Sequence, residues 1–241
     1  MSDSTLTNSD LAPVPESGRT WSKWHLAALW IGMSVCIPTY MLAAGMIKAG
    51  MNWWQAVITV MLGNLIVLVP MILNGHGGTK YGVPFPVLVR SSFGTTGAQI
   101  PAIARSLVAC GWFGIQTWIG GAAIYSIIAT LGWIDIEPDS AKIGLLGITA
   151  IQFACFMIFW LLHVAIVVTG INSIKRLEFW AAPFLIAAGI ALFVWAMIRA
   201  SEADGGIAVL FSSETNYPDG SGFWTVFFPL LTAMVGFWAT L

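Results

Sequence analysis

Charged residues are scarce in this chain. Only 9% of its 241 residues are Asp, Glu, Lys or Arg, whereas an ordinary soluble domain carries roughly 25%. Ten basic and eleven acidic residues leave a formal net charge of -1, so the composition gives no sign of a nucleic-acid partner, which would need a basic excess. Since 58% of the residues are hydrophobic and the mean hydropathy is +0.83, the sequence predicts an all-α protein embedded in a lipid bilayer.

Residues that commonly build metal or catalytic centres are also few. The cysteines lie far apart within apolar runs, which indicates small buried hydrophobic residues; they are Cys36, Cys110 and Cys155. The histidines stand on different segments, without the spacing of zinc ligands; they are His25, His76 and His163. No Ser, His and Asp set can be assembled on one side of a membrane. We therefore expect neither an enzyme nor a bound cofactor.

Long apolar runs recur along the chain. A bilayer core of about 30 Å requires about 20 helical residues, and the sequence predicts five complete spans and an incomplete sixth. They are Leu26–Ile47, Trp53–Leu73, Ile100–Trp133, Ile143–Ile171, Phe179–Ile198 and Phe223–Leu241. The polar residues 1–22 lack the pattern of a cleaved signal and are predicted to form a disordered cytoplasmic tail.

The distribution of basic residues predicts the orientation. With the N-terminus inside, seven basic residues are cytoplasmic and three lie outside, which favours a cytoplasmic N-terminus. The inner set is Arg19, Lys23, Lys80, Arg90, Arg105, Lys175 and Arg176, and the outer set is Lys48, Lys142 and Arg199.

The first span contains Pro38 near its middle. A proline there removes a backbone donor and clashes with the carbonyl four residues earlier, which belongs to Ser34. In lipid, backbone groups freed in this way must be satisfied or must line a cavity. The stretch from Ser34 to Thr39 is therefore either a simple kink or an unwound binding segment.

Polar side chains within the spans are few, and none is a carboxylate. They are Thr39, Asn64, Gln116, Thr117, Thr130, Gln152 and His163. A carboxylate-based proton relay would place Asp or Glu at depth, so the pattern favours a cage of neutral oxygens around a small hard cation. For His163, one interhelical hydrogen bond is favoured over a proton relay. The glycine-rich stretch NGHGGTKYG lacks the order of a phosphate-binding loop and predicts a tight turn between the second and third spans.

The segment CGWFGIQTWIGG places an amide between two tryptophans. Residues four apart share a helix face, so Trp112 and Gln116 lie together, and Trp118 points elsewhere. Ala109 and Gly120 lie beside them as small residues that are expected to leave room on this face. This face suits a planar heteroaromatic ring or cyclic ureide, which would stack on indole and pair with the amide. The alternative is a glycine-lined helix contact in which the glutamine bonds to a neighbouring helix.

Several stretches together resemble one family. WIGMSVCIPTYMLAAG, GTKYGVPFPVLVRSSFG, WFGIQTWIGG and GFWATL resemble the nucleobase:cation symporter-1 family, also called the purine-cytosine permease family. The resemblance covers essentially the whole chain after residue 20. It implies the inverted-repeat fold also seen in LeuT, with residues 23–241 as a transmembrane transporter domain that contains the first repeat and the start of the second. The chain stops at Leu241 inside an apolar run, where the family continues, so we expect a partial sequence.

The resemblance also implies site residues, by position. The substrate ring would be sandwiched between two tryptophans, with an amide partner and a cysteine alongside; these residues are Trp112, Trp238, Gln116 and Cys36. A sodium ion would be bound by the backbone carbonyls of Gly32 and Val35.

The expected protein is therefore a multi-pass transporter of the cytoplasmic membrane. It would import a nucleobase or related ureide of the allantoin, uracil or hydantoin class by symport with Na⁺ or H⁺, as a monomer. One alternative is a cytosine or purine permease of the same family. Another is a non-transporting membrane scaffold or receptor in which the Trp112–Gln116 face is merely packing.

Overall fold

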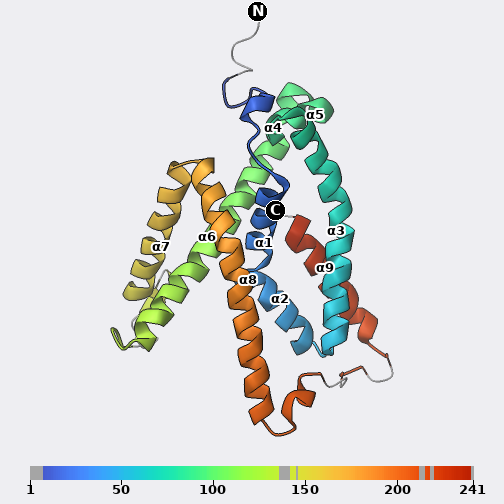
Figure 1. Cartoon of the computed structure of the whole chain (residues 1–241), viewed down its shortest axis with the longest axis vertical. Coiled ribbons are helices and arrows are strands. Elements are labelled where there is room, and N and C mark those ends of the chain that lie inside the picture. The colour runs from blue at the N-terminus through green and yellow to red at the C-terminus, as the bar shows by residue number, and fades with distance from the viewer. Residues whose placement is uncertain (1–7, 136–141, 145, 212–214, 218–219, 240–241) are drawn as a thin grey trace, which may run out of the picture. The chain divides into compact units, whose positions relative to one another are not determined.

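The computed structural model describes the chain except for residues 1–7, 136–141, 145, 212–214, 218–219 and 240–241. Its α-helices are α1 (Lys23–Ser34), α2 (Ile37–Lys48), α3 (Trp53–Tyr81), α4 (Phe85–Leu88), α5 (Arg90–Gly97), α6 (Gln99–Thr130), α7 (Ala150–Val168), α8 (Ile171–Glu202) and α9 (Phe223–Ala239) (Figure 1). The shorter elements are η1 (Glu16–Gly18), β1 (Lys142–Ile143), β2 (Ile148–Thr149) and η3 (Gly206–Val209).

The chain forms two compact units. The first unit contains Met1–Ser106 and Ala181–Leu241, and the second contains Leu107–Trp180. Helices α6 and α8 each contribute residues to both units.

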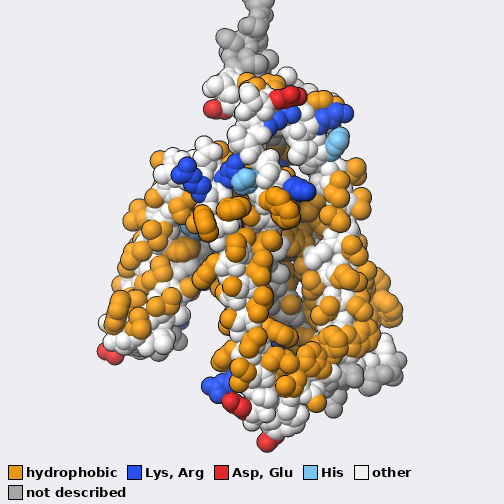
Figure 2. All heavy atoms as spheres, viewed as in Figure 1, with side chains coloured by type: hydrophobic (Ala, Val, Ile, Leu, Met, Phe, Trp, Pro, Cys, Tyr) orange, Lys and Arg blue, Asp and Glu red, His pale blue; other side chains and the backbone are white. Residues whose placement is uncertain are grey.

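Four described helices, α3, α6, α7 and α8, are long and apolar enough to cross a membrane, and α1 with α2 makes a fifth crossing if this bent pair is one span. The shorter apolar helix α9 corresponds to the sixth predicted span. On the face shown in Figure 2, hydrophobic side chains predominate along the helices, and charged side chains gather toward helix ends. This distribution is what a lipid-facing surface requires, because charges are costly in the bilayer interior. The multi-pass arrangement predicted from the apolar runs is confirmed.

The first span is broken rather than simply kinked. Helix α1 ends at Ser34, α2 begins at Ile37, and the two helices are bent by 51°. Between them, Val35 (φ -87°, ψ 75°) and Cys36 (φ -140°, ψ 158°) leave the helical conformation. Pro38 lies in the first turn of α2, where its missing N–H has no helical partner to lose. Pro38 therefore starts a second helix instead of bending a continuous one.

The turn predicted at NGHGGTKYG is wrong. Helix α3 continues through these residues to Tyr81, and the chain turns at Gly82, whose φ of 67° is left-handed. Glycine costs about 1 kcal/mol in a helix interior, a penalty that does not end a helix with good cap contacts. The reversal therefore occurs at the position that requires a positive φ.

The N-terminal segment binds this end of α3. The Val14 N–H donates to the Gly82 carbonyl (2.8 Å), and the Arg19 guanidinium donates to the carbonyls of Val14 (3.0 Å) and Lys80 (3.1 Å). The Lys80 bond satisfies a carbonyl that the end of the helix would otherwise leave unpaired. Residues 1–7 of the predicted tail lie outside the described residues, and the division of the chain at residue 22 stays a prediction.

The fourth membrane helix begins later than predicted. In place of a helix from Ile143, strands β1 and β2 pair antiparallel, and α7 begins at Ala150. The hairpin turn uses Gly147 at φ 66°. Thr149 and Gln152 then cap α7 reciprocally, each accepting the other's backbone N–H (3.3 Å and 3.0 Å). Gln152, counted among the polar span residues, is therefore a helix-capping residue.

The core of the first unit lies where α3 meets α9, which run side by side in Figure 1. Gly63 on α3 permits the close approach, because a Cβ there would lie 2.5 Å from Cγ of Met234. Met234 is only 1% exposed. The buried residues of this core are Met46, Met51, Ala56, Val67, Met234 and Trp238.

Residues 215–217, ahead of α9, contact the turn between α2 and α3. The Tyr217 hydroxyl donates to the Ala49 carbonyl (2.6 Å), and both the Thr215 hydroxyl (2.7 Å) and the Asn216 N–H (3.1 Å) donate to the Gly50 carbonyl. Gly50 has a φ of 95°, and a Cβ there would lie 2.5 Å from Nδ2 of Asn216. These bonds satisfy carbonyls at the end of α2 and connect the start of α9 to the α2–α3 turn.

Candidate functional site

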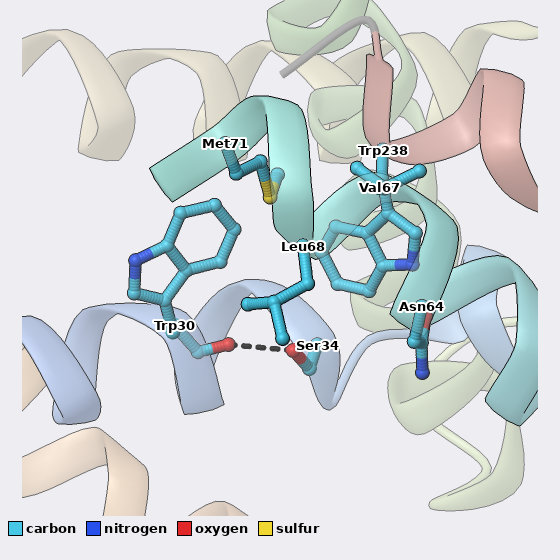
Figure 3. Close-up of a pocket in the computed structure, with 7 residues that line it drawn as sticks. All are labelled: Trp30, Ser34, Asn64, Val67, Leu68, Met71 and Trp238. Atoms are coloured by element: carbon cyan, nitrogen blue, oxygen red, sulfur yellow. Dashed lines mark hydrogen bonds between the residues drawn. The ribbon is translucent and has the colours of Figure 1, made fainter. Parts of the chain in front are cut away.

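A cavity of about 160 Å³ opens in the first unit, where the last turns of α1 face α3 and α9 (Figure 3). It is lined by Trp30, Ser34, Asn64, Val67, Leu68, Met71 and Trp238. The four α3 residues follow i, i+3, i+4, i+7 spacing and therefore share one helix face. The cavity thus combines two indole rings with one amide and one hydroxyl.

Trp238 is the most buried aromatic residue of this cavity, at 7% exposed. It lies one helical turn after Met234, and its ring centroid is 6.2 Å from that of Trp30 at an interplanar angle of 50°. Its indole Nε1 is buried and has no hydrogen-bond partner among the described residues. Contacts between α3 and α9 therefore position the ring, while its polar atom is left without an acceptor.

The helix break places backbone oxygens near the middle of the first span, in the same unit. A helix leaves its last carbonyls without intrahelical partners, and in α1 this set includes the carbonyl of Gly32. The Val35 N–H closes the last turn by donating to Ile31 (2.9 Å). Cys36 follows in an extended conformation, with its Sγ 3.2 Å from the Thr39 hydroxyl. The predicted residues Gly32, Val35 and Cys36 therefore all lie at this break.

In the second unit, α6 packs closely on α7. A Cβ on Gly121 would lie 2.7 Å from Cα of Phe156, so only glycine fits this approach. Thr117 is fully buried, donates to the Phe113 carbonyl (2.6 Å) and lies 3.4 Å from Nδ1 of His163. Within the described residues, His163 thus makes an interhelical hydrogen bond, the role that was favoured over a proton relay.

The predicted Trp112–Gln116 face lies on α6 in the second unit. Both residues are half-buried, whereas Trp118 is 43% exposed. The prediction that Gly120 leaves open space on this face is wrong, because a Cβ there would collide with the ring of Phe159 on α7. The interhelical bond in the described part of this unit is made by Thr117, and Gln116 makes none there.

The predicted site residues thus fall into two groups. Trp238, Cys36, Gly32 and Val35 belong to the first unit, and Trp112 and Gln116 belong to the second. Sequence reasoning missed the cavity's other polar and aromatic lining. Asn64 was recognised only as a polar span residue; its spacing to the α3 residues that line the cavity was the signal that could have placed it there.

A broken membrane helix beside a cavity lined by aromatic and neutral polar side chains is typical of secondary transporters. Comparison with known families agrees. The chain belongs to the family described as permease for cytosine/purines, uracil, thiamine and allantoin, whose sequence profile matches residues 13–241. The prediction that the chain belongs to a permease family rather than an enzyme family is therefore confirmed.

Individual relatives show the same similarity. The chain is 45% identical to the purine-uracil permease NCS1 of Arabidopsis thaliana, over 99% of this chain and 39% of that protein. It is 35% identical to the allantoin permease of Bacillus subtilis (strain 168), over 98% of this chain and 47% of that protein. The chain therefore spans less than half the length of these relatives.

A solved structure confirms the fold. Mhp1, a nucleobase-cation-symport-1 family transporter in a closed conformation with bromovinylhydantoin bound, superposes with a TM-score of 0.78 at 24% identity. The match covers 98% of this chain and 46% of Mhp1. The predicted fold class, the N-terminal portion of this transporter fold, is thereby confirmed.

Proposed function

We propose that this chain functions in a secondary active transporter that imports a nucleobase or related ureide, of the allantoin, uracil or hydantoin class, by cation symport. The observation that carries the proposal is the broken α1–α2 pair beside the cavity that holds Trp238. The names of the relatives, which include allantoin and purine-uracil permeases, support the substrate class. The cavity has no charged lining residue, which favours a neutral ring because an unpaired buried charge is costly.

Four side chains are proposed to bind this substrate. Trp112 and Trp238 would each offer an indole face for stacking, Gln116 would pair its amide with ring C=O and N–H groups, and Cys36 would lie next to the ring. Gln116 is suited to this role because its amide makes no hydrogen bond in the described part of its unit. The cavity with its two indoles supports the assignment of Trp238.

The proposed coupling ion is Na⁺, bound by the backbone carbonyls of Gly32 and Val35. Hard cations prefer oxygen ligands, and broken transporter helices supply such carbonyls. The end of α1 fits this chemistry, because Val35 leaves the helical conformation and the last carbonyls of α1 have no partner in the helix. The two carbonyls would supply part of the ion's oxygen shell.

We further propose a monomer in the cell membrane with a cytoplasmic N-terminus. The orientation is supported by the excess of Lys and Arg, seven against three, on the predicted inner side.

Uptake by the natural-length gene product tests the function. Cells with and without the gene are given radiolabelled allantoin, uracil, hydantoin or cytosine, in sodium or choline buffer and with or without a protonophore. We expect gene-dependent, sodium-dependent uptake of one of the first three rings. Equal uptake with and without the gene for every ring would refute transport, and uptake that ignores sodium but collapses with the protonophore would replace Na⁺ by H⁺.

Variants of α6 test the substrate face. Gln116→Leu leaves the polar edge of the ring unpaired, which should cost about 1–3 kcal/mol, or roughly 5- to 150-fold in affinity. Trp112→Ala should cost a comparable amount, by analogy with about 1–3 kcal/mol for bases stacked on aromatic residues. Trp118→Phe, on another face, is the control and should change little. Tight binding by Gln116→Leu with loss of binding by Trp118→Phe would show that the wrong face was chosen.

A further inference from the structure

The cavity of the first unit contains a polar group for which stacking gives no role. The indole of Trp238 is 7% exposed, and its Nε1 has no hydrogen-bond partner among the described residues. Native proteins leave few buried donors unpaired, because such a group has lost its water without gaining an acceptor. Trp238 therefore requires an acceptor that the described part of the chain does not supply in this state.

Asn64 on α3 is a second polar group at this cavity, and unlike Trp238 it is exposed. Its side chain lies on the nitrogen side of the Trp238 indole in Figure 3, and it lines the same cavity. A carboxamide offers two N–H donors and one carbonyl acceptor, and Asn64 makes no hydrogen bond to another described residue, so both functions are available to a ligand. By contrast, the Ser34 hydroxyl already donates to the Trp30 carbonyl (2.7 Å).

Together these groups match one kind of ligand edge. In a cyclic amide, a C=O stands next to an N–H, so the C=O can accept from Trp238 Nε1 while the N–H donates to Asn64 Oδ1. No lining residue is charged, which excludes an ionic ligand on the ground of desolvation. The cavity of about 160 Å³ is below the roughly 300 Å³ at which pockets for drug-sized ligands begin, so it suits a single small ring.

We infer that Asn64 is a specificity-determining residue, which binds the cyclic-amide edge of the substrate ring together with the indole N–H of Trp238. The inference rests on the proposed function and deepens it: because the indole N–H lies in the plane of its ring, Trp238 then binds the edge of the substrate as a hydrogen-bond donor in place of stacking on its face, and stacking is left to Trp112. Nε1 is covered in the present arrangement, so the indole turns about its side-chain torsions when a ligand enters. The pairing predicts a preference for rings with an unsubstituted amide edge.

The test combines a variant with a modified ligand. Asn64→Leu removes the amide at nearly constant size, and the natural-length protein is purified in detergent for equilibrium binding. The ligand is whichever of uracil, hydantoin and allantoin the parent binds, compared with its N-methylated form. Thr232→Val on α9 is the control, since Thr232 is exposed and does not line the cavity, and among the described residues its hydroxyl bonds to the Phe228 carbonyl of its own helix. Thermal unfolding is recorded for every protein.

We expect Asn64→Leu to weaken binding of the unmodified ring roughly 5- to 150-fold with little change in the unfolding temperature, and Thr232→Val to leave binding unchanged. N-methylation should weaken binding to the parent but much less to Asn64→Leu, because contacting groups are not additive. An equal methylation penalty in both proteins, or unaltered binding by Asn64→Leu, overturns the inference. If Asn64→Leu does not fold, Asn64→Ala enters the same comparison. Failure of the parent to bind any of the three rings overturns the proposed function itself, and thereby distinguishes the two failures.

Discussion

Replacing Gly63 by alanine tests the contact that positions Trp238. The new Cβ would lie 2.5 Å from Cγ and 2.9 Å from Cβ of Met234, whereas carbon atoms in contact sit about 3.5–4.0 Å apart. Met234 is 1% exposed, and its Cβ and Cγ are held close to the α9 backbone, so they cannot move aside as the far end of a flexible side chain could. Overpacking of this kind costs about 1–3 kcal/mol, and the better helix propensity of alanine returns about 1 kcal/mol. The net loss of stability is therefore about 0–2 kcal/mol.

A matched glycine separates these two effects. An added Cβ at Gly45 in α2 meets nothing within 4 Å, so Gly45→Ala should gain the propensity term alone. Thermal unfolding of the two variants in detergent should then differ by about 1–3 kcal/mol. Adding Met234→Ala to Gly63→Ala should cost less than the separate losses combined, because the two changes share one contact. Equal stability of the two glycine variants, or full additivity with Met234→Ala, would refute the reasoning.

Two further predictions concern other contacts. Gly121→Ala places a Cβ 2.7 Å from the backbone of Phe156, whereas the Cβ of Gly111→Ala meets nothing within 4 Å. Gly121→Ala should therefore destabilise the protein by about 1–3 kcal/mol relative to Gly111→Ala. Similar unfolding temperatures for the two variants would contradict the α6–α7 packing. Tyr217→Phe removes the 2.6 Å bond to the Ala49 carbonyl and should lower the free energy of unfolding by about 1 kcal/mol; an unchanged denaturation curve would show that this bond contributes nothing.

The membrane helices were predictable because their signal is local. For the third span, the predicted Ile100–Trp133 corresponds to Gln99–Thr130 in the structure, since length and hydropathy alone determine such a segment. The glycine-rich end of α3 was not predictable in this way. Contacts from Arg19 and Val14, distant in sequence, complete that helix end, and a local reading of glycines cannot include them.

The candidate site likewise combines features that the local sequence predicts with features that depend on tertiary contacts. Pro38 predicted irregular backbone at the correct place, but the choice between a kink and a break depends on how the two half-helices pack. Gly120 was interpreted as open space because the sequence does not say that Phe159 fills it. Asn64 received no role because the face of α3 that meets α9 is decided by the tertiary contact of Gly63 with Met234. The roles of Trp112, Gln116 and Trp238 in binding stay predictions.

The bond between Tyr217 and Ala49 has a consequence for biosynthesis. Its partners are 168 residues apart, and at about 5–20 residues per second of synthesis the tyrosine leaves the ribosome roughly 8 to 34 seconds after the alanine. Until residues 215–217 are synthesised, the carbonyls of Ala49 and Gly50 at the α2–α3 turn lack these partners and bond to water instead. A ribosome stalled before residue 215 would leave the two carbonyls of this turn without these bonds. The quality-control machinery of the cell would then encounter an incompletely folded protein.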